Sequence, residues 1–269
     1  MEKGFLQDPP SYRHHTMLDE RKLRLLETRI DGWRNRTKDD DQRKTYDEVF
    51  DQRTLLVIYK LITAGTIATV DYPVSTGKEG NVFHATAGSR GVALKIYRVS
   101  NASFRSLSDY ILGDPRFRGI QHDRRKIITA WATKEFKNLE RMHLAGTRVP
   151  KPIAVRANVL VMDYIGDDTM PAPMLKSVSV DDPEAALDDV IDNMKCIQKA
   201  RLVHGDLSEY NLLLWQGKTY VIDVGQAVTL DHRNSEDWFT RDVGNIARYF
   251  KRLGCKVTPA IIRERVRGA

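Results

Sequence analysis

The sequence predicts an α+β protein of two lobes, in which an N-terminal lobe with an antiparallel sheet and a helix precedes a mainly helical C-terminal lobe. Two observations lead to this prediction. Strand-like segments separated by short turns occupy residues 69–97, whereas apolar residues at helical spacing mark residues 184–201 and the end of the chain. A chain of 269 residues is also long enough for two lobes that share a cleft.

The composition is that of an ordinary soluble globular protein, with 41% hydrophobic and 29% charged residues. The formal charge of +7 and the isoelectric point near 9.3 allow an anionic partner without establishing one. The two cysteines, Cys196 and Cys255, lack metal-ligand spacing. No apolar run reaches the length of a membrane span, and the N-terminus lacks the apolar core of a signal peptide. We therefore expect a cytoplasmic protein without a membrane partner.

The N-terminal lobe is expected at about residues 47–162, after a polar, helical extension over residues 1–46. Its predicted elements are a helix at Arg53–Ala64, strands at Thr69–Val74, Asn81–Ala85 and Gly91–Tyr97, a helix at Trp131–Leu144 and a strand at Val159–Ile165. Residues 99–125 lack clear periodicity, and so long a connection within a domain is usually functional or disordered.

The C-terminal lobe is expected at about residues 166–269, beginning at Gly166 with a proline-rich turn. Asp182 and Pro183 should cap a helix over residues 184–201. The remaining elements are a hairpin of Leu212–Leu214 with Thr219–Ile222, and a basic helical segment from Asp237.

Residues 204–211, with the sequence His-Gly-Asp-Leu-Ser-Glu-Tyr-Asn, contain the clearest chemical pattern. Asp206 is followed five residues later by Asn211, and Asp223 ends an apolar, β-branched run. In phosphoryl transfer, the first Asp positions the attacking hydroxyl, while the Asn and the second Asp hold Mg²⁺ against the nucleotide phosphates. Alone, this segment could also be a polar loop between strands. We expect His204 to hold the loop through a hydrogen bond rather than to act as a base.

Lys95 is flanked by apolar residues in a predicted strand, so its ammonium group needs an anionic partner. A nucleotide phosphate and the carboxylate of Glu135 both qualify, and a surface position at an edge strand is the alternative. Upstream, the small residues of Val74–Val82 would let backbone N–H groups approach phosphate, although glycine-rich hairpins are common.

The order of these parts is more informative than any one of them. They follow one another in the order found in a protein-kinase fold. The parts are a glycine-rich hairpin, a Lys on a strand, a Glu on a helix, an apolar strand with a turn, an Asp-x4-Asn loop and an Asp at the end of a strand. We therefore predict a protein-kinase-like arrangement of the two lobes.

At these motifs the chain resembles the RIO family of atypical serine/threonine protein kinases, and the archaeal-like type-1 branch in particular. The matching motifs are Ser75–Glu79 with Asn81-Val82, Leu94–Tyr97, Lys134-Glu135-Phe136 with Asn138-Leu139, Met162–Gly166, Pro171–Pro173, Leu202–Asn211 and Ile222–Gln226. The resemblance extends from about Asp47 to about Gly254. Type-2 relatives begin with a winged helix, whereas this N-terminus carries Ile30-Asp31-Gly32-Trp33.

The resemblance implies a two-lobed domain without the peptide-substrate subdomains of ordinary eukaryotic kinases, and no Ala-Pro-Glu follows Asp223. It also implies a serine kinase and ATPase that uses ATP with Mg²⁺ or Mn²⁺ and acts in maturation of the small ribosomal subunit. The implied catalytic residues are Lys95, Glu135, Asp206 and Asp223, and the implied metal ligands are Asn211 and Asp223. Asp223 could also accept phosphate as an aspartyl-phosphate.

The implied ATP-binding residues belong to the hairpin, to the strand of Lys95 and to the segment between the lobes. They are Ser75, Thr76, Gly77, Lys78, Glu79, Gly80, Val82, Ala93, Lys95, Met162, Asp163, Tyr164, Ile165 and Pro171. We expect the adenine ring to lie against Met162, with hydrogen bonds to the backbone between Asp163 and Ile165.

Two other functions stay open at this point. Small-molecule phosphotransferases of the aminoglycoside or choline kinase type share His-Gly-Asp and the following Asn, although Ser208-Glu209-Tyr210 favours the RIO family. The chain could also be an assembly factor whose ATP cycle gates binding of a particle, with incidental kinase activity.

Basic and hydroxyl side chains suggest a partner and a phosphorylation site. Ser100, Ser103, Ser106 and Ser108 lie near arginines and could accept phosphate slowly.

Basic residues gather in two stretches, at Arg116, Arg118, Arg124, Arg125 and Lys126, and at Arg248, Lys251, Arg252, Lys256, Arg263, Arg265 and Arg267. These could contact ribosomal RNA of a small-subunit precursor, or simply be solvated helix faces. We expect no DNA partner.

Overall fold

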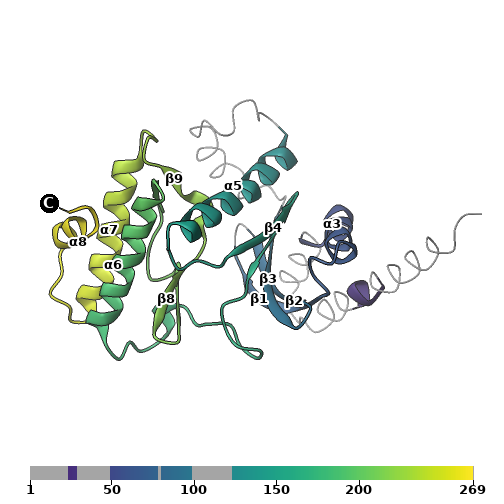
Figure 1. Ribbon diagram of the computed structural model, residues 1–269, viewed down its shortest axis with the longest axis horizontal. Helices are drawn as coiled ribbons and strands as arrows, with labels where there is room; N and C mark the ends of the chain where they lie inside the picture. The colour runs from purple at the N-terminus through teal and green to yellow at the C-terminus, as the bar shows by residue number, and fades with distance from the viewer. Residues whose placement is uncertain (1–23, 29–48, 78–79, 99–122, 269) are drawn as a thin grey trace, which may run out of the picture.

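The structure, a computed structural model, describes residues 24–28, 49–77, 80–98 and 123–268. It shows two lobes with helix α5 (Arg124–Leu144) between them (Figure 1). Most of the predicted extension, residues 1–46, lies outside the described residues, as do residues 99–122 of the predicted connection; residues 24–28 are helical. The expected α+β, kinase-like architecture is confirmed.

The N-terminal lobe contains an antiparallel sheet with the strand order β1-β2-β3-β5-β4. The strands are β1 (Thr69–Thr76), β2 (Gly80–Ala87), β3 (Arg90–Tyr97), β4 (Pro152–Arg156) and β5 (Val159–Asp163). The sequence did not predict β4, since this edge strand is short, begins with proline and has half-buried residues where alternation would be expected.

The register of the sheet places several predicted nucleotide-binding side chains on one face. Directly opposed residues of antiparallel strands share a face. Lys95 on β3 is opposite Val82 on β2, and Ala93 is opposite Met162 on β5. Ala93 and Lys95 are two residues apart on one strand, so all four side chains lie on the same face.

The two faces of the sheet pack into different apolar cores. On one face, Val92, Leu94 and Ile96 pack into a core with Ile58 of α3 (Gln52–Thr63). On the other, Ala93 and Met162 join a core that includes residues of α5 and of the C-terminal lobe. The face that carries Lys95 is therefore turned toward the second lobe.

Helix α5 is longer at its N-terminus than predicted. It begins at Arg124 rather than at Trp131, and the Asp123 side chain caps it by accepting hydrogen bonds from Arg125 N and Lys126 N. The helix starts with three charged residues, so its first turn shows no apolar periodicity in the sequence, although Ile127 and Ile128 are buried. The end of the expected connection is thus helical.

The C-terminal lobe contains three α-helices, two short 3-10 helices (η2 and η3) and two small sheets among its described residues. Its elements are η2 (Leu175–Ser177), α6 (Pro183–Lys199), β6 (Leu202–Val203), β7 (Leu212–Trp215), β8 (Lys218–Val221), η3 (Val224–Gln226), β9 (Val228–Thr229), α7 (Ser235–Arg252) and α8 (Pro259–Arg267). The predicted caps of α6 are present, with Asp182 accepting from Ala185 N at 3.0 Å. No helix in the described ranges is both long and apolar enough to cross a membrane.

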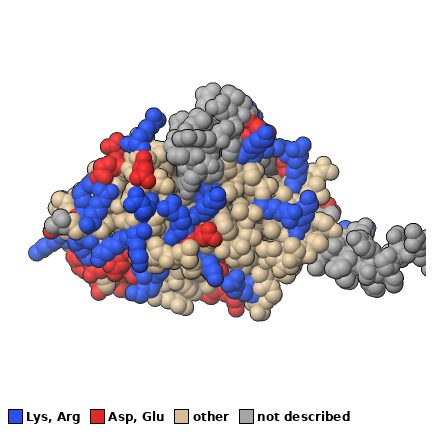
Figure 2. All heavy atoms as spheres, turned by 45° about the horizontal axis from the view of Figure 1, so that its top comes forward, with Lys and Arg blue, Asp and Glu red and all other residues tan. Residues whose placement is uncertain are grey.

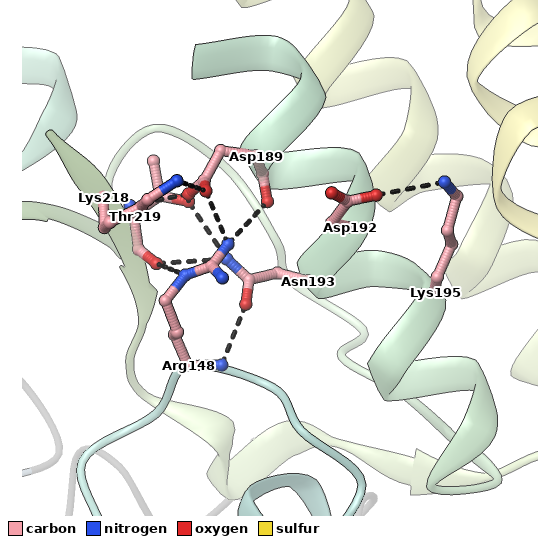
Figure 3. Close-up of polar contacts among 7 residues, drawn as sticks. All are labelled: Arg148, Asp189, Asp192, Asn193, Lys195, Lys218 and Thr219. Carbon is pink, nitrogen blue, oxygen red and sulfur yellow. Dashed lines mark hydrogen bonds and ion pairs between the residues drawn. The ribbon is translucent and has the colours of Figure 1, made fainter. Parts of the chain in front are cut away.

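A buried carboxylate on α6 ties the loop after α5 to the C-terminal lobe (Figure 3). Asp189 accepts hydrogen bonds from Thr219 N at 2.8 Å and Thr219 Oγ1 at 2.6 Å, and pairs with Arg148 at 2.7 Å. Burial acts to raise the pKa of Asp189, but the hydrogen bonds from Thr219 and the charge of Arg148 outweigh it and lower the pKa. Asn193 adds hydrogen bonds from its Nδ2 to Thr219 O and Oγ1. This cluster fixes where the segment leading to β4 meets the helical lobe.

Candidate active site

The Lys95 side chain lies between two carboxylates that come from different parts of the fold. Its Nζ is 2.8 and 2.9 Å from the two oxygens of Glu135 on α5, and 2.8 Å from Asp223 Oδ1. The Tyr97 hydroxyl also donates a hydrogen bond to Glu135. The pair of Lys95 with Glu135 that the sequence suggested is present, and the contact with Asp223 joins the sheet to the C-terminal lobe.

Burial and charge set the ionisation of this cluster. Lys95 is 8% exposed and Glu135 is 1% exposed. Burial acts to lower the pKa of Lys95, but the charges of Asp223 and Glu135 outweigh it and raise the pKa above its ordinary value. The charge of Lys95 in turn holds the pKa of Asp223 below its usual range. Both groups are therefore ionised at neutral pH.

Asp223 has an unusual backbone conformation and an accessible side chain. Its φ of 59° and ψ of 55° lie in the left-handed region, which residues other than glycine seldom adopt. Its side chain is 41% exposed although its neighbours Val224 and Gly225 are buried. A ligand can therefore reach the carboxylate without displacing Lys95.

A buried carboxylate on α7 holds the backbone of the loop that contains Asp206. Asp242 accepts hydrogen bonds from Gly205 N at 2.8 Å and Leu207 N at 2.7 Å, the residues on either side of Asp206. Arg241 donates to the carbonyl of Gly205, and Asn245 donates to that of Leu207 at 3.2 Å. These contacts fix the backbone of Asp206 while its side chain stays partly exposed.

Asn211 and His204 connect this loop with the strand that leads to Asp223. The amide Nδ2 of Asn211 donates to Asp206 O at 2.8 Å, which leaves the amide oxygen as the atom able to bind a cation. His204 Nε2 donates to Ile222 O at 3.1 Å, so His204 holds the loop as expected. Ile222 N also donates to Asn211 O. The structure thus brings Asp206, Asn211 and Asp223 into one region.

The predicted nucleotide-binding residues are arranged around the same face of the sheet. Ser75 and Thr76 end β1, and Gly77 N donates to Gly80 O at 2.9 Å, which closes the hairpin; Lys78 and Glu79 lie outside the described residues. A Cβ at Gly80 would approach Ile96 O to 2.5 Å, so this close approach of strands requires glycine.

The segment between the lobes offers fewer backbone groups to adenine than the sequence suggested. Asp163 N donates to Lys151 O, and Ile165 O accepts from Ala172 N, each at 2.9 Å. Tyr164 follows β5, and Pro171 pairs with Gly166 in an isolated bridge. Asp163 N and Ile165 O are thus already hydrogen bonded within the protein. Adenine would therefore bind other backbone groups between Asp163 and Ile165.

A hollow of about 510 Å³ lies beside this segment. Its lining includes the hinge residues Asp163–Ile165 together with Arg90, Thr147, Arg148 and Tyr220. It is not lined by Lys95, Asp206 or Asp223, and so it is distinct from the region of the predicted catalytic residues.

Comparisons with known proteins show the family to which this chain belongs. The chain matches the family model described as "RIO domain" over residues 81–261. The RIO-type serine/threonine-protein kinase Rio1 of Haloferax volcanii is 46% identical over 250 residues, which is 93% of this chain and 86% of that protein. This chain belongs to the RIO family of serine/threonine protein kinases. Rio1 of Thermoplasma acidophilum is 42% identical over 69% of this chain and 98% of its own length.

Other relatives are longer than this chain. Serine/threonine-protein kinase RIO1 of Homo sapiens is 41% identical, and the match covers 81% of this chain but 39% of the human protein. The crystal structure of the Rio2 kinase from Chaetomium thermophilum is similar with a TM-score of 0.63 and 25% identity, over 79% of this chain and 67% of that one. The resemblance to the type-1 branch of the RIO family is confirmed by the Rio1 relatives.

Sequence reasoning assigned no role to several residues that organise the site. Lys134 and Asn138 belong to the family motif, and Asp242 lies in the predicted C-terminal helical segment. Each is a polar residue at a buried position of a helix, 0% exposed for the first two and 2% for Asp242. A polar residue on the apolar side of a predicted helix is the one sign in the sequence that such a residue is buried. Its hydrogen-bond partners could not be predicted, because they are backbone groups far away in the chain.

Asp242 gives a testable pH dependence. Burial raises its pKa to about 6, although its hydrogen bonds and Arg241 oppose the shift. The folded protein therefore binds this proton more tightly than the unfolded chain does, and stability is lost as pH rises through the window from about 4 to about 6. We expect the free energy of unfolding of the wild type, relative to Asp242→Asn, to fall by on the order of 2 to 3 kcal/mol across this window.

Urea unfolding of both proteins between pH 4 and pH 8 measures this difference. Above about pH 6 the difference should become constant. A difference that does not change with pH, or that grows as pH rises, would show that Asp242 does not titrate as a buried carboxyl.

Proposed function

We propose that this protein transfers the γ-phosphoryl group of ATP to serine, including serines of its own chain, and hydrolyses ATP. The observation that carries the proposal is the Lys95 ammonium held by Glu135 and Asp223, in the same region as Asp206 and Asn211. Phosphoryl transfer depends on positioning and on stabilising charge, and these residues supply both.

Each residue has a defined part in the proposed reaction. Lys95, fixed by Glu135, contacts the nucleotide phosphates and stabilises charge that develops on them. Asp206 orients the acceptor hydroxyl and takes its proton as the oxygen attacks the γ-phosphorus. The bond from the γ-phosphorus to the bridging oxygen breaks, and ADP leaves. Val82, Ala93 and Met162 form the apolar surface on which adenine lies.

Mg²⁺ fits the donor atoms that this site offers. Asp223 and Asn211 present carboxylate and amide oxygens, which are the hard ligands that Mg²⁺ prefers. Among the described residues, no three His, Cys, Asp or Glu side chains are grouped to hold a metal by themselves. The remaining ligands would come from nucleotide phosphates and water, as is usual for Mg²⁺ with ATP. Bound there, the ion would neutralise charge on the phosphates.

Asp223 is also the proposed acceptor of phosphate in a covalent state. Its ionised oxygen would attack the γ-phosphorus, ADP would leave, and water would later hydrolyse the acyl phosphate. A Rio2 kinase structure from Chaetomium thermophilum, similar with 24% identity and a TM-score of 0.62 over 80% of this chain and 66% of that one, is described as an ADP/Mg2+-phosphoaspartate complex. The alternative is that Asp223 binds the metal only.

The proposed cellular role is maturation of the small ribosomal subunit in the cytoplasm, through contact with precursor particles and their RNA. On the face of the molecule that Figure 2 shows, Lys and Arg side chains are interspersed with acidic ones. Several basic residues of the C-terminal stretch are ion-paired within the lobe: Arg263 and Arg267 with Glu236, Arg265 with Asp188, and Arg252 with Glu209. The exposed residues Arg248, Lys251 and Lys256 form no ion pair with a described residue, and they support the proposal best.

Substitution of Asp206 tests the catalytic assignment. Asp206→Asn should reduce phosphoryl transfer by about 10²–10⁴-fold while ATP affinity stays nearly unchanged, because positioning a hydroxyl matters mainly in the transition state. The measurement is a single-turnover reaction with γ-labelled ATP, alongside equilibrium binding of nucleotide. Asp192→Asn, which removes an exposed carboxylate on α6, is the control.

The labelled protein also separates the two roles of Asp223, because hydroxylamine cleaves acyl phosphates and leaves phosphoserine intact. Label on an aspartate should be lost, and label on serine should be retained and map to Ser100, Ser103, Ser106 or Ser108. Retention of all label would remove the aspartyl-phosphate, and wild-type turnover in Asp206→Asn would overturn the catalytic assignment.

The ribosomal proposal predicts an electrostatic interaction. Charge reversal at Arg248, Lys251 and Lys256 should weaken co-sedimentation with small-subunit precursors, and binding of the wild type should fall steeply as salt increases. Lys195→Glu, on the exposed surface of α6, is the control. Binding that ignores both salt and the reversals would contradict this account and leave the kinase assignment intact.

A further inference from the structure

The backbone that follows Asp223 is hydrogen bonded to the side of helix α5. Lys134 Nζ donates to Gly225 O at 2.8 Å. Asn138 Nδ2 donates to Val224 O at 2.9 Å and to Ala227 O at 3.0 Å. Two side chains one helical turn apart thus hold three carbonyl groups of residues 224–227, which we refer to as the Asp223 segment.

These contacts are made in the interior of the protein. Lys134 and Asn138 are both 0% exposed, and the Lys134 ammonium also lies 4.9 Å from the ring centre of Trp131. A buried amide or ammonium group is stable only when it has polar partners, and the carbonyls of the Asp223 segment provide them. The segment and α5 are therefore bound to each other more firmly than by apolar contact alone.

The glycine in the segment gives independent support for this close approach. A Cβ added to Gly225 would lie 2.9 Å from Trp131 Nε1 and 3.1 Å from Glu135 Oε2, both on α5. Only glycine lets the backbone pass so near to the helix and to the carboxylate that pairs with Lys95. The segment is fitted to this surface of α5 by its own sequence as well as by the hydrogen bonds.

Helix α5 consequently holds both Lys95 and the backbone that follows Asp223, its ion-pair partner in the C-terminal lobe. Glu135 contacts Lys95, while Lys134 and Asn138 of the same helix hold the Asp223 segment. The left-handed conformation of Asp223 persists only where the surrounding structure determines it, and this segment is its immediate continuation.

We propose that Lys134 and Asn138 are positioning residues for the carboxylate of Asp223, which they orient through the backbone of the Asp223 segment. They touch neither nucleotide nor metal. Their effect is to hold Asp223 where it can bind a divalent cation together with the phosphates, so that a shift of α5 would move Lys95 and Asp223 together. The inference rests on the proposed function, in which Asp223 is a metal ligand.

The test compares two buried asparagines that differ in what they hold. Asn138→Ala removes two hydrogen bonds to the Asp223 segment. Asn193→Ala, the control in the cluster of Figure 3, removes three hydrogen bonds of a similarly buried amide, two to Thr219 and one from Arg148 N. Both variants should lower the melting temperature by similar amounts. Only Asn138→Ala should raise the Mg²⁺ concentration for half-maximal ATPase activity, by about tenfold, the size expected for two ordinary hydrogen bonds.

A second pair of variants keeps the test usable if Asn138→Ala does not fold. Lys134→Met removes the ammonium but keeps an unbranched side chain, and should raise the Mg²⁺ requirement in the same direction, with Lys134→Arg restoring part of it. Lys137→Met, at an exposed position of the same helix, is its control and should leave the requirement unchanged.

Asp223→Asn separates failure of this inference from failure of the proposed function. If Asp223→Asn raises the Mg²⁺ requirement while Asn138→Ala and Lys134→Met behave as their controls do, the positioning role is overturned and the metal site stands. If Asp223→Asn leaves the requirement unchanged, the metal role of Asp223 is overturned and the positioning role with it.

Discussion

The rest of the site depends on one buried ammonium group shared by two carboxylates. Lys95 lies in the interior of the sheet, where its charge would be costly without partners, and Glu135 and Asp223 both contact it at 2.8 Å. One carboxylate comes from the helix between the lobes and the other from the C-terminal lobe. The need to compensate this charge therefore fixes three separate parts of the chain relative to one another, and it keeps Asp223 ionised.

Two further polar clusters hold the parts that the Lys95 cluster connects. Asp242 fixes the backbone on both sides of Asp206, and Asp189 fixes the loop after α5 against β8. Both are buried carboxylates that accept hydrogen bonds from the backbone, and Asp242 holds the loop of Asp206 without using the Asp206 side chain. The supporting side chains thus come from helices, while the proposed catalytic residues Asp206 and Asp223 lie in a loop and at the end of a strand.

The sequence predicted the contact between Lys95 and Glu135 but not the residues that support the surrounding backbone. Lys95 and Glu135 could be paired in advance because a strand Lys needs an anionic partner and Glu135 follows it in the order of a protein-kinase fold. The roles of Lys134, Asn138 and Asp242 could not be predicted, since each acts on backbone carbonyl or N–H groups far away in the chain, which no side-chain pattern reveals. Strand β4 and the first turns of α5 were missed because a short edge strand and a charged helix start carry little periodicity.

The central claim is that Lys95 and Glu135 are energetically coupled, and a double-mutant cycle on the free energy of unfolding tests it most directly. Lys95→Met alone leaves Glu135 buried without its cation and should be strongly destabilising, whereas adding Glu135→Gln should recover part of the loss. The account predicts that the two single losses exceed the loss in the double variant by roughly 1 to 3 kcal/mol. Losses that simply add would contradict it, because the ion pair would then contribute nothing to holding helix α5 against the sheet.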